Sequence, residues 1–119
     1  MNDPQTRAQQ LMGGIAPKLV ELTDDVLFGD VWRRPGLAPR DRSLITVAAL
    51  VSLYRTDQVE SHMRRALDNG LTVEELAEAI THLAFYAGWP CAVSAVVTLR
   101  RIVDEGASGA GTAPPTSAS

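Results

Sequence analysis

The two histidines of this 119-residue chain are the side chains best suited to acid–base chemistry at neutral pH. His62 lies three residues after Val59 and four before Ala66, at the edge of the apolar stripe of a helix expected over residues 57–68. A histidine in that position can be a hydrogen-bonded structural residue, or an acid or base that lines a pocket. The pattern alone leaves both interpretations open and leans slightly to the structural one.

The second histidine, His82, belongs to a polar strip on the helix expected after Thr72. Glu78, His82 and Tyr86 follow one another at intervals of four residues, so they lie on one side of a helix. Glu78 can therefore hydrogen-bond to or pair with His82. Such a strip can line a cleft, but the pattern favours a polar side that faces solvent or another subunit.

Other kinds of reactive site find less support in the sequence. Arginine can bind a carboxylate through two parallel hydrogen bonds, although most arginines on helices simply face water. Cys91 is the single cysteine and resembles a small packing residue more than a reactive thiol. The two histidines are far apart in sequence and belong to no run that resembles a set of metal ligands, so we expect neither a metal nor a cofactor.

Helices are expected to carry all of these residues, because no core segment alternates like a half-buried strand. The helix boundaries follow from prolines at first helical positions, capping boxes and turn residues: Pro17, Pro39, Asp57 with Glu60, Thr72 with Glu75, Asn69-Gly70 and Gly88. We therefore predict an all-α fold of about six helices, over residues 6–12, 17–28, 39–54, 57–68, 73–88 and 90–105.

Two of the expected helices are apolar on every face, over residues 44–53 and 91–99. A helix of that kind must be buried on every face. A single domain of about 100 ordered residues can bury one such helix but hardly two. We therefore expect a homo-oligomer in which a second subunit covers the remaining faces. The alternative is one well-covered helical hairpin in a monomer.

Composition limits the remaining function classes. The net charge is −3 and no block of Lys or Arg stands out, which argues against binding to nucleic acid or an anionic membrane. The polar start of the chain lacks a signal-peptide core, and no apolar run reaches the roughly 18 residues that span a bilayer, so we expect a cytoplasmic protein. Residues 106–119 are uncharged and low in hydrophobicity, and we predict a disordered tail after one domain over residues 1–105.

Three runs of the sequence, Asp41–Leu50, His62–Thr72 and His82–Pro90, resemble the carboxymuconolactone decarboxylase family within the broader alkylhydroperoxidase D-like fold. The resemblance covers about residues 25–104. It implies an all-α subunit assembled as a homohexamer, built as a trimer of dimers. That implication agrees with the burial argument, which does not depend on it.

The broader fold also contains thiol peroxidases, which carry a Cys-x-x-Cys pair shortly before a histidine and a glutamate further upstream. Counting back from His62, the two cysteine positions hold Arg55 and Gln58, and the glutamate position holds Ser43. Thiol peroxidase chemistry needs those cysteines, so the resemblance points to the decarboxylase branch.

The reaction implied by the resemblance is the cofactor-free loss of CO₂ from 4-carboxymuconolactone. His62 is the first candidate for the acid or the oxyanion donor, and His82 with Glu78 and Tyr86 is the second. Arg42 or Arg65 could hold the remaining carboxylate of the substrate. The alternatives are a different lyase or isomerase acting on a related small oxidised substrate, and a non-catalytic oligomer that binds a small ligand.

Overall fold

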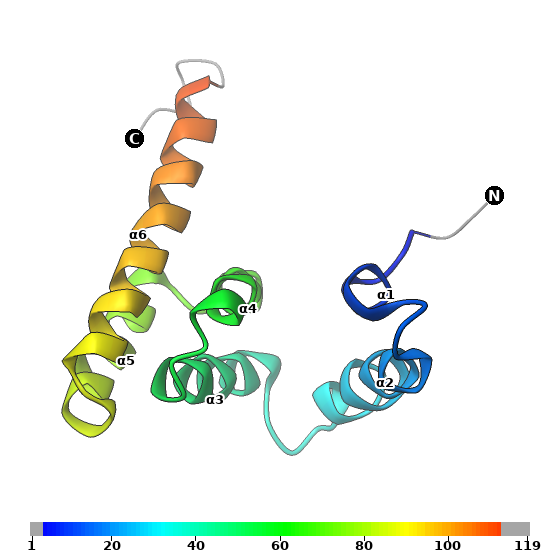
Figure 1. Cartoon of the computed structure of the whole chain (residues 1–119). Coiled ribbons are helices and arrows are strands. Elements are labelled where there is room, and N and C mark those ends of the chain that lie inside the picture. Colours follow the sequence, from blue (N-terminus) through cyan, green and yellow to red (C-terminus); the bar gives the residue numbers. More distant parts are fainter. Residues whose placement is uncertain (1–3, 113–119) are drawn as a thin grey trace. The chain divides into compact units, whose positions relative to one another are not determined.

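The computed structural model describes residues 4–112, with side chains placed through residue 107, and every regular element in that range is helical. The prediction of an all-α fold is confirmed for these residues (Figure 1). The helices are α1 Arg7–Met12, α2 Pro17–Glu21, α3 Pro39–Ser52, α4 Thr56–Asp68, α5 Val73–Ala87 and α6 Trp89–Thr112. A π-helical segment, Leu22–Phe28, continues α2, and a short 3₁₀ turn follows at Val31–Arg33.

The chain forms two compact units that divide between Pro39 and Arg40. In the N-terminal unit, Ala8 is the one buried residue among those described. Residues 17–28 carry the apolar side chains Leu19, Leu22 and Val26, but these are 43–50% exposed within this unit. The N-terminal unit therefore has almost no hydrophobic core of its own. A single domain over residues 1–105 stays a prediction.

The C-terminal unit has a hydrophobic core supplied by all four of its helices. α6 packs against both α4 and α5, which make little direct contact with each other. The largest contributions come from fully or nearly fully buried aliphatic side chains: Val47, Val51, Met63, Leu76, Ile80 and Leu99. The apolar stripes of α4 and α5 thus face α6, and this packing positions both helices that carry the candidate histidines.

Most predicted helix ends are confirmed. Thr72 and Glu75 form the expected capping box, with backbone-to-side-chain distances of 3.0 Å in both directions. Gly70, at φ 106°, adopts the left-handed backbone that ends α4. The Asp57–Glu60 capping box is wrong, because α4 begins one residue earlier with no side-chain cap.

The carboxylate of Glu60 instead joins α4 to α6. It accepts hydrogen bonds from Arg64 at 2.9 Å and from Arg101 at 2.6 Å, and Arg64 also pairs with Glu105. These arginines lower the pKa of Glu60, with Arg101 the larger cause. Partly exposed ion pairs of this kind each contribute little to stability, so their main effect is to fix how α4 lies on α6.

α6 continues to Thr112, past the boundary predicted at Glu105. Extending a formed helix adds one backbone hydrogen bond per residue, so propagation is easier than starting a new helix. The rest of the predicted disordered tail, residues 113–119, lies outside the described residues. In Figure 1 the last turns of α6 extend beyond the other helices of the C-terminal unit.

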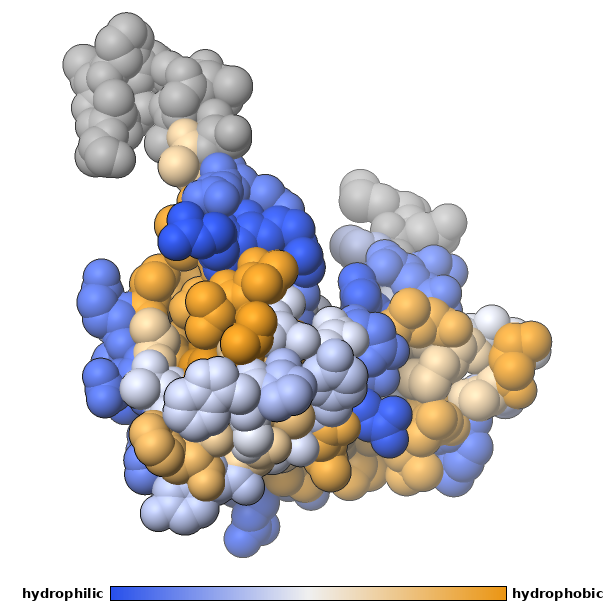
Figure 2. Space-filling view, turned by 60° about the vertical axis from the view of Figure 1, so that its left-hand side comes forward, coloured by the Kyte–Doolittle hydropathy of each residue, from blue (hydrophilic) through white to orange (hydrophobic). Residues whose placement is uncertain are grey.

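The two helices that are apolar on every face remain partly uncovered in the single chain. Ile45 on α3, Leu53 just after its end, and Val93, Val96 and Val97 on α6 are 46–67% exposed. Figure 2 shows hydrophobic side chains open on the surface of the column that contains α6. The expected covering of these faces by another subunit stays a prediction.

Candidate active site

His62 lies on α4 beside the stripe that packs into the core. Val59, Met63 and Ala66 are buried with at most 2% of their surface exposed, and the imidazole is half-buried at their edge. Its Nδ1 atom is fully buried and has no hydrogen-bond partner among the described residues. A structural histidine would be expected to have that partner, so the geometry favours the functional interpretation.

The electrostatic surroundings of His62 keep its imidazole neutral. Burial is the larger cause, because it disfavours the charged ring, and the nearby Arg65 cation adds to the effect. Together they lower the pKa of His62 below its ordinary value of 6.5. At pH 7 the ring therefore offers one N–H donor and one acceptor nitrogen, not two donors.

Arg42, in the first turns of α3, is half-buried, whereas Arg65 is exposed. Next to Arg42, the fully buried hydroxyl of Ser43 accepts a hydrogen bond of 2.9 Å from the side-chain amide of Asn69, at the end of α4. This bond fixes the start of α3 on the end of α4, about 10 Å along the helix from His62. Arg42 is thereby held near the C-terminal half of α4.

The predicted Glu78–His82–Tyr86 strip lies on the exposed surface of α5. His82 stacks on Tyr86 with ring centroids 5.0 Å apart, and Tyr86 is 77% exposed. The possible Glu78–His82 hydrogen bond is not formed among the described residues, and Glu78 is exposed. Spacing of four residues lets two side chains meet, but on an exposed face water competes for both.

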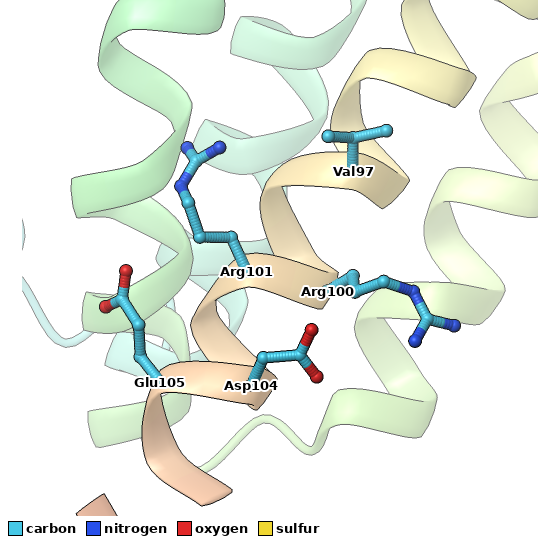
Figure 3. Close-up of a pocket in the computed structure, with 5 residues that line it drawn as sticks. All are labelled: Val97, Arg100, Arg101, Asp104 and Glu105. Carbon is cyan, nitrogen blue, oxygen red and sulfur yellow. The ribbon is translucent and has the colours of Figure 1, made fainter. Parts of the chain in front are cut away.

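The structure does not bring the two histidines together within one chain. His62 lies on α4 and His82 on α5, and α6 packs between these helices. Figure 3 shows this arrangement along the C-terminal half of α6. Arg101 and Glu105 extend towards α4, and Arg100 extends towards the opposite side. No hydrogen bond, ion pair or ring contact of the described side chains joins the two candidate groups.

Three cavities occur near α6, and none is lined by the six predicted site residues. The largest is an open groove of about 400 Å³ lined by Val97, Arg100, Arg101, Asp104 and Glu105 (Figure 3). A second, of about 220 Å³, lies between Val73 of α5 and the valines and Arg100 of α6. A third, of about 10 Å³, lies where α3, α4 and α6 meet. His62 lines none of these three cavities.

Two features near the candidate site have no clear sequence signal. The Ser43–Asn69 bond joins residues 26 apart, and neither residue type demands such a partner. Tyr54, between α3 and α4, adopts a left-handed backbone with φ 59°, which is uncommon for a residue with a side chain. Its hydroxyl accepts a 3.5 Å hydrogen bond from Ser94 of α6. The first feature joins the start of α3 to the end of α4, and the second lies in the connection between these two helices.

Two further properties of residues 4–112 complete the description. No group of three or more His, Cys, Asp or Glu side chains gathers there as metal ligands would. No helix in that range combines the length and the apolar character needed to cross a membrane.

Comparison with known proteins identifies the family. The profile of the carboxymuconolactone decarboxylase family matches residues 17–100, which include all six predicted site residues. The chain belongs to this family. Membership of the carboxymuconolactone decarboxylase family confirms the resemblance carried by the three sequence runs.

Two relatives of this chain have names that specify a reaction. The 4-carboxymuconolactone decarboxylase of Acinetobacter baylyi is 45% identical over 69 residues, which are 58% of this chain and 52% of that protein. The nitrosuccinic acid decarboxylase of Metarhizium robertsii is 36% identical over 85 residues, which are 71% of this chain and 59% of that protein. The chain thus spans between half and three fifths of the length of these relatives.

Proposed function

We propose that this chain catalyses the cofactor-independent decarboxylation of a small carboxylated lactone, with 4-carboxymuconolactone as the first candidate. The observation that carries the proposal is that both relatives are named decarboxylases although their substrates differ. Loss of CO₂ is the chemistry that the two names share. The half-buried, neutral imidazole of His62 supports the same conclusion, because it lies inside the stretch that defines the family.

The chemistry of the lactone sets what the protein must supply. The departing carboxylate sits on a carbon that is conjugated, through a double bond, to the lactone carbonyl. When the C–C bond breaks, its electron pair moves through the double bond onto the carbonyl oxygen and gives a dienolate. A proton from solvent then adds to carbon, and the electron pair returns from oxygen. The protein must therefore stabilise an oxyanion and then allow protonation.

His62 is the residue we assign to the oxyanion. A neutral imidazole donates one N–H to the developing negative charge, and its lowered pKa keeps it in that form at pH 7. Its half-buried position also limits the water around the oxyanion, so the hydrogen bond is stronger than it would be in solvent. His82, with Glu78 and Tyr86, is the second candidate group.

Arg42 is the residue we assign to the remaining carboxylate of the substrate. Arg42 is half-buried, the neighbouring Ser43–Asn69 bond fixes the turn of α3 that carries it, and guanidinium groups match carboxylates in shape and charge. Arg65 is exposed and acts on His62 through its charge. We therefore assign Arg65 to control of the pKa of His62.

We also propose that the working form is a homo-oligomer, with the hexamer implied by the family as the first expectation. The exposed apolar faces of α3 and α6 support this proposal, as does the nearly coreless N-terminal unit. Each leaves hydrophobic surface in contact with water unless another chain covers it.

A second candidate substrate is a nitro-substituted succinate, which the name of the Metarhizium relative favours. Loss of CO₂ beside a nitro group places the electron pair on the nitro oxygens, so the demand for an oxyanion donor is the same. Spectrophotometric assays of the purified protein with each compound separate the candidates. We expect the higher kcat/KM with the lactone; the reverse order would assign the chain to nitro acids.

Replacing Arg65 with glutamine should move the acid limb of the pH–rate profile. Because the neutral form of His62 is the active one, log kcat/KM should fall as pH falls through the pKa of His62, which lies below 6.5 in the wild type. Arg65→Gln removes a positive charge that disfavours the imidazolium, so the pKa should rise and the limb should move to higher pH. The NMR titration of the His62 ring protons should shift in the same direction.

The matched control is Arg55→Gln, an exposed arginine at the start of α4 that does not contribute to the lowered pKa of His62. It should leave the titration of His62 unchanged. An acid limb that stays in place in Arg65→Gln, while the NMR titration moves, would mean that His62 does not control the rate.

A further inference from the structure

The candidate site around His62 is incomplete within the C-terminal unit. Nδ1 is buried without a hydrogen-bond partner among the described residues, and an unsatisfied buried polar atom is unfavourable. The three cavities described near α6 are not lined by His62. A decarboxylase site needs a wall that excludes water, and something outside these helices must supply it.

A second group of side chains lacks a cover. His82, Phe85, Tyr86 and Trp89, here named the aromatic corner, lie where α5 meets α6. Three of the six aromatic residues of the chain are in this corner and are 58–77% exposed. They are already ordered in pairs, with Phe85 edge-on to Trp89 at 5.3 Å and His82 stacked on Tyr86 at 5.0 Å. Exposed, preordered aromatic rings are typical of protein interfaces.

The exposed residues around His62 on α4 and around His82 on α5 carry opposite charges at matching helical spacings. On α4, Arg55, Gln58, His62 and Arg65 follow one another at helical spacing, with arginines at both ends of the line. On α5 the line through His82 and Tyr86 continues backwards to the exposed Glu78 and Glu74. If α5 of one copy lies antiparallel to α4 of another copy, with His82 opposite His62, then Arg65 lies opposite Glu78. Arg55 then faces Trp89, a favourable partner for a guanidinium.

We infer that the aromatic corner of a second copy of this chain closes the His62 site, so that each site contains His62 of one copy and His82 of another. This inference rests on the proposed function for the role of the site, but the contact itself does not depend on the substrate. α6 packs between α4 and α5, so one chain cannot bring its own two groups together. A second copy can, and it covers exposed aromatic surface at the same time.

Mixing two inactive variants tests the shared site. His62→Ala and His82→Ala should each lower kcat/KM of the wild-type oligomer by at least about tenfold. Unfolded and refolded together in equal amounts, they should recover about one quarter of wild-type activity, because one site in four combines both intact histidines. Native mass spectrometry shows whether the chains have mixed.

Two results of this experiment would overturn the inference. One is mixed oligomers without recovered activity, which places both histidines of a site in the same chain. The other is wild-type activity in His82→Ala alone, which removes His82 from the site.

Cross-linking tests the contact without any substrate. In a Cys91→Ser background, chains carrying Arg65→Cys are mixed with chains carrying Glu78→Cys, and oxidation should give covalent dimers that contain one of each. The matched control replaces Glu78→Cys with Asp104→Cys, an exposed acid on α6. If the yield of cross-linked dimers is no greater than in this control, the inference is overturned, even when the protein is active. Specific cross-linking in a protein that turns over neither substrate would leave the contact standing and remove the proposed function.

Discussion

Replacing His62 with alanine should lower kcat for decarboxylation by about 10²–10⁴-fold, the usual contribution of one positioned acid–base or oxyanion group. The helical fold should survive, because the side chain makes no hydrogen bond through its buried nitrogen and only borders the core. Steady-state kinetics measure the effect, with circular dichroism and light scattering to compare fold and size. Loss of kcat with little change in KM is expected for a group that acts on the transition state.

The control for this variant is Ser61→Ala, one residue away on the same helix. Ser61 is exposed and its hydroxyl bonds only the backbone carbonyl of Gln58, so kcat should stay near the wild-type value. If His62→Ala retains wild-type kcat while folded and of unchanged size, His62 has no catalytic role. The group containing His82 would then be the remaining candidate.

Replacing Leu76 with alanine should destabilise the protein by about 2–5 kcal/mol, the range found when large aliphatic side chains are removed from cores. Leu76 has no exposed surface and belongs to the core formed where α5 packs on α6. Because the small aliphatic residues around Leu76 are closely packed, few side chains can move into the cavity that the substitution creates. Urea denaturation followed by circular dichroism measures the change in the free energy of unfolding.

Leu53→Ala removes the same atoms from a side chain that is 67% exposed. Its cost should be below about 1 kcal/mol, as for most surface substitutions. Equal losses from the two variants would contradict the assignment of the core to the α5–α6 contact, since burial is what distinguishes the two leucines.

Local sequence signals predicted the helices of this chain well, because their causes are local. On α4 the buried Val59, Met63 and Ala66 follow the three- and four-residue spacing of a helix face that packs on a neighbour. The Thr72–Glu75 capping box needs only residues within one turn. These features locate the helices that carry His62 and His82 without any knowledge of the tertiary structure.

Features that depend on distant partners could not be predicted in the same way. Glu60 matched the spacing of a capping box with Asp57, yet its carboxylate pairs with Arg101, 41 residues further along the chain. Glu78 and His82 have the right spacing to pair, but His82 stacks on Tyr86 instead. The unsatisfied Nδ1 of His62 is likewise a property of packing, which periodicity cannot specify.

We propose that this chain removes CO₂ from a small carboxylated lactone with its own side chains alone. The most direct test incubates the purified wild-type protein, dialysed against a metal chelator, with 4-carboxymuconolactone and measures both CO₂ release and the ultraviolet change. We expect repeated turnover with one CO₂ released for each lactone consumed, at the same rate as before dialysis. Absence of CO₂ release by folded protein, or activity that returns only when a metal is added back, would contradict the claim.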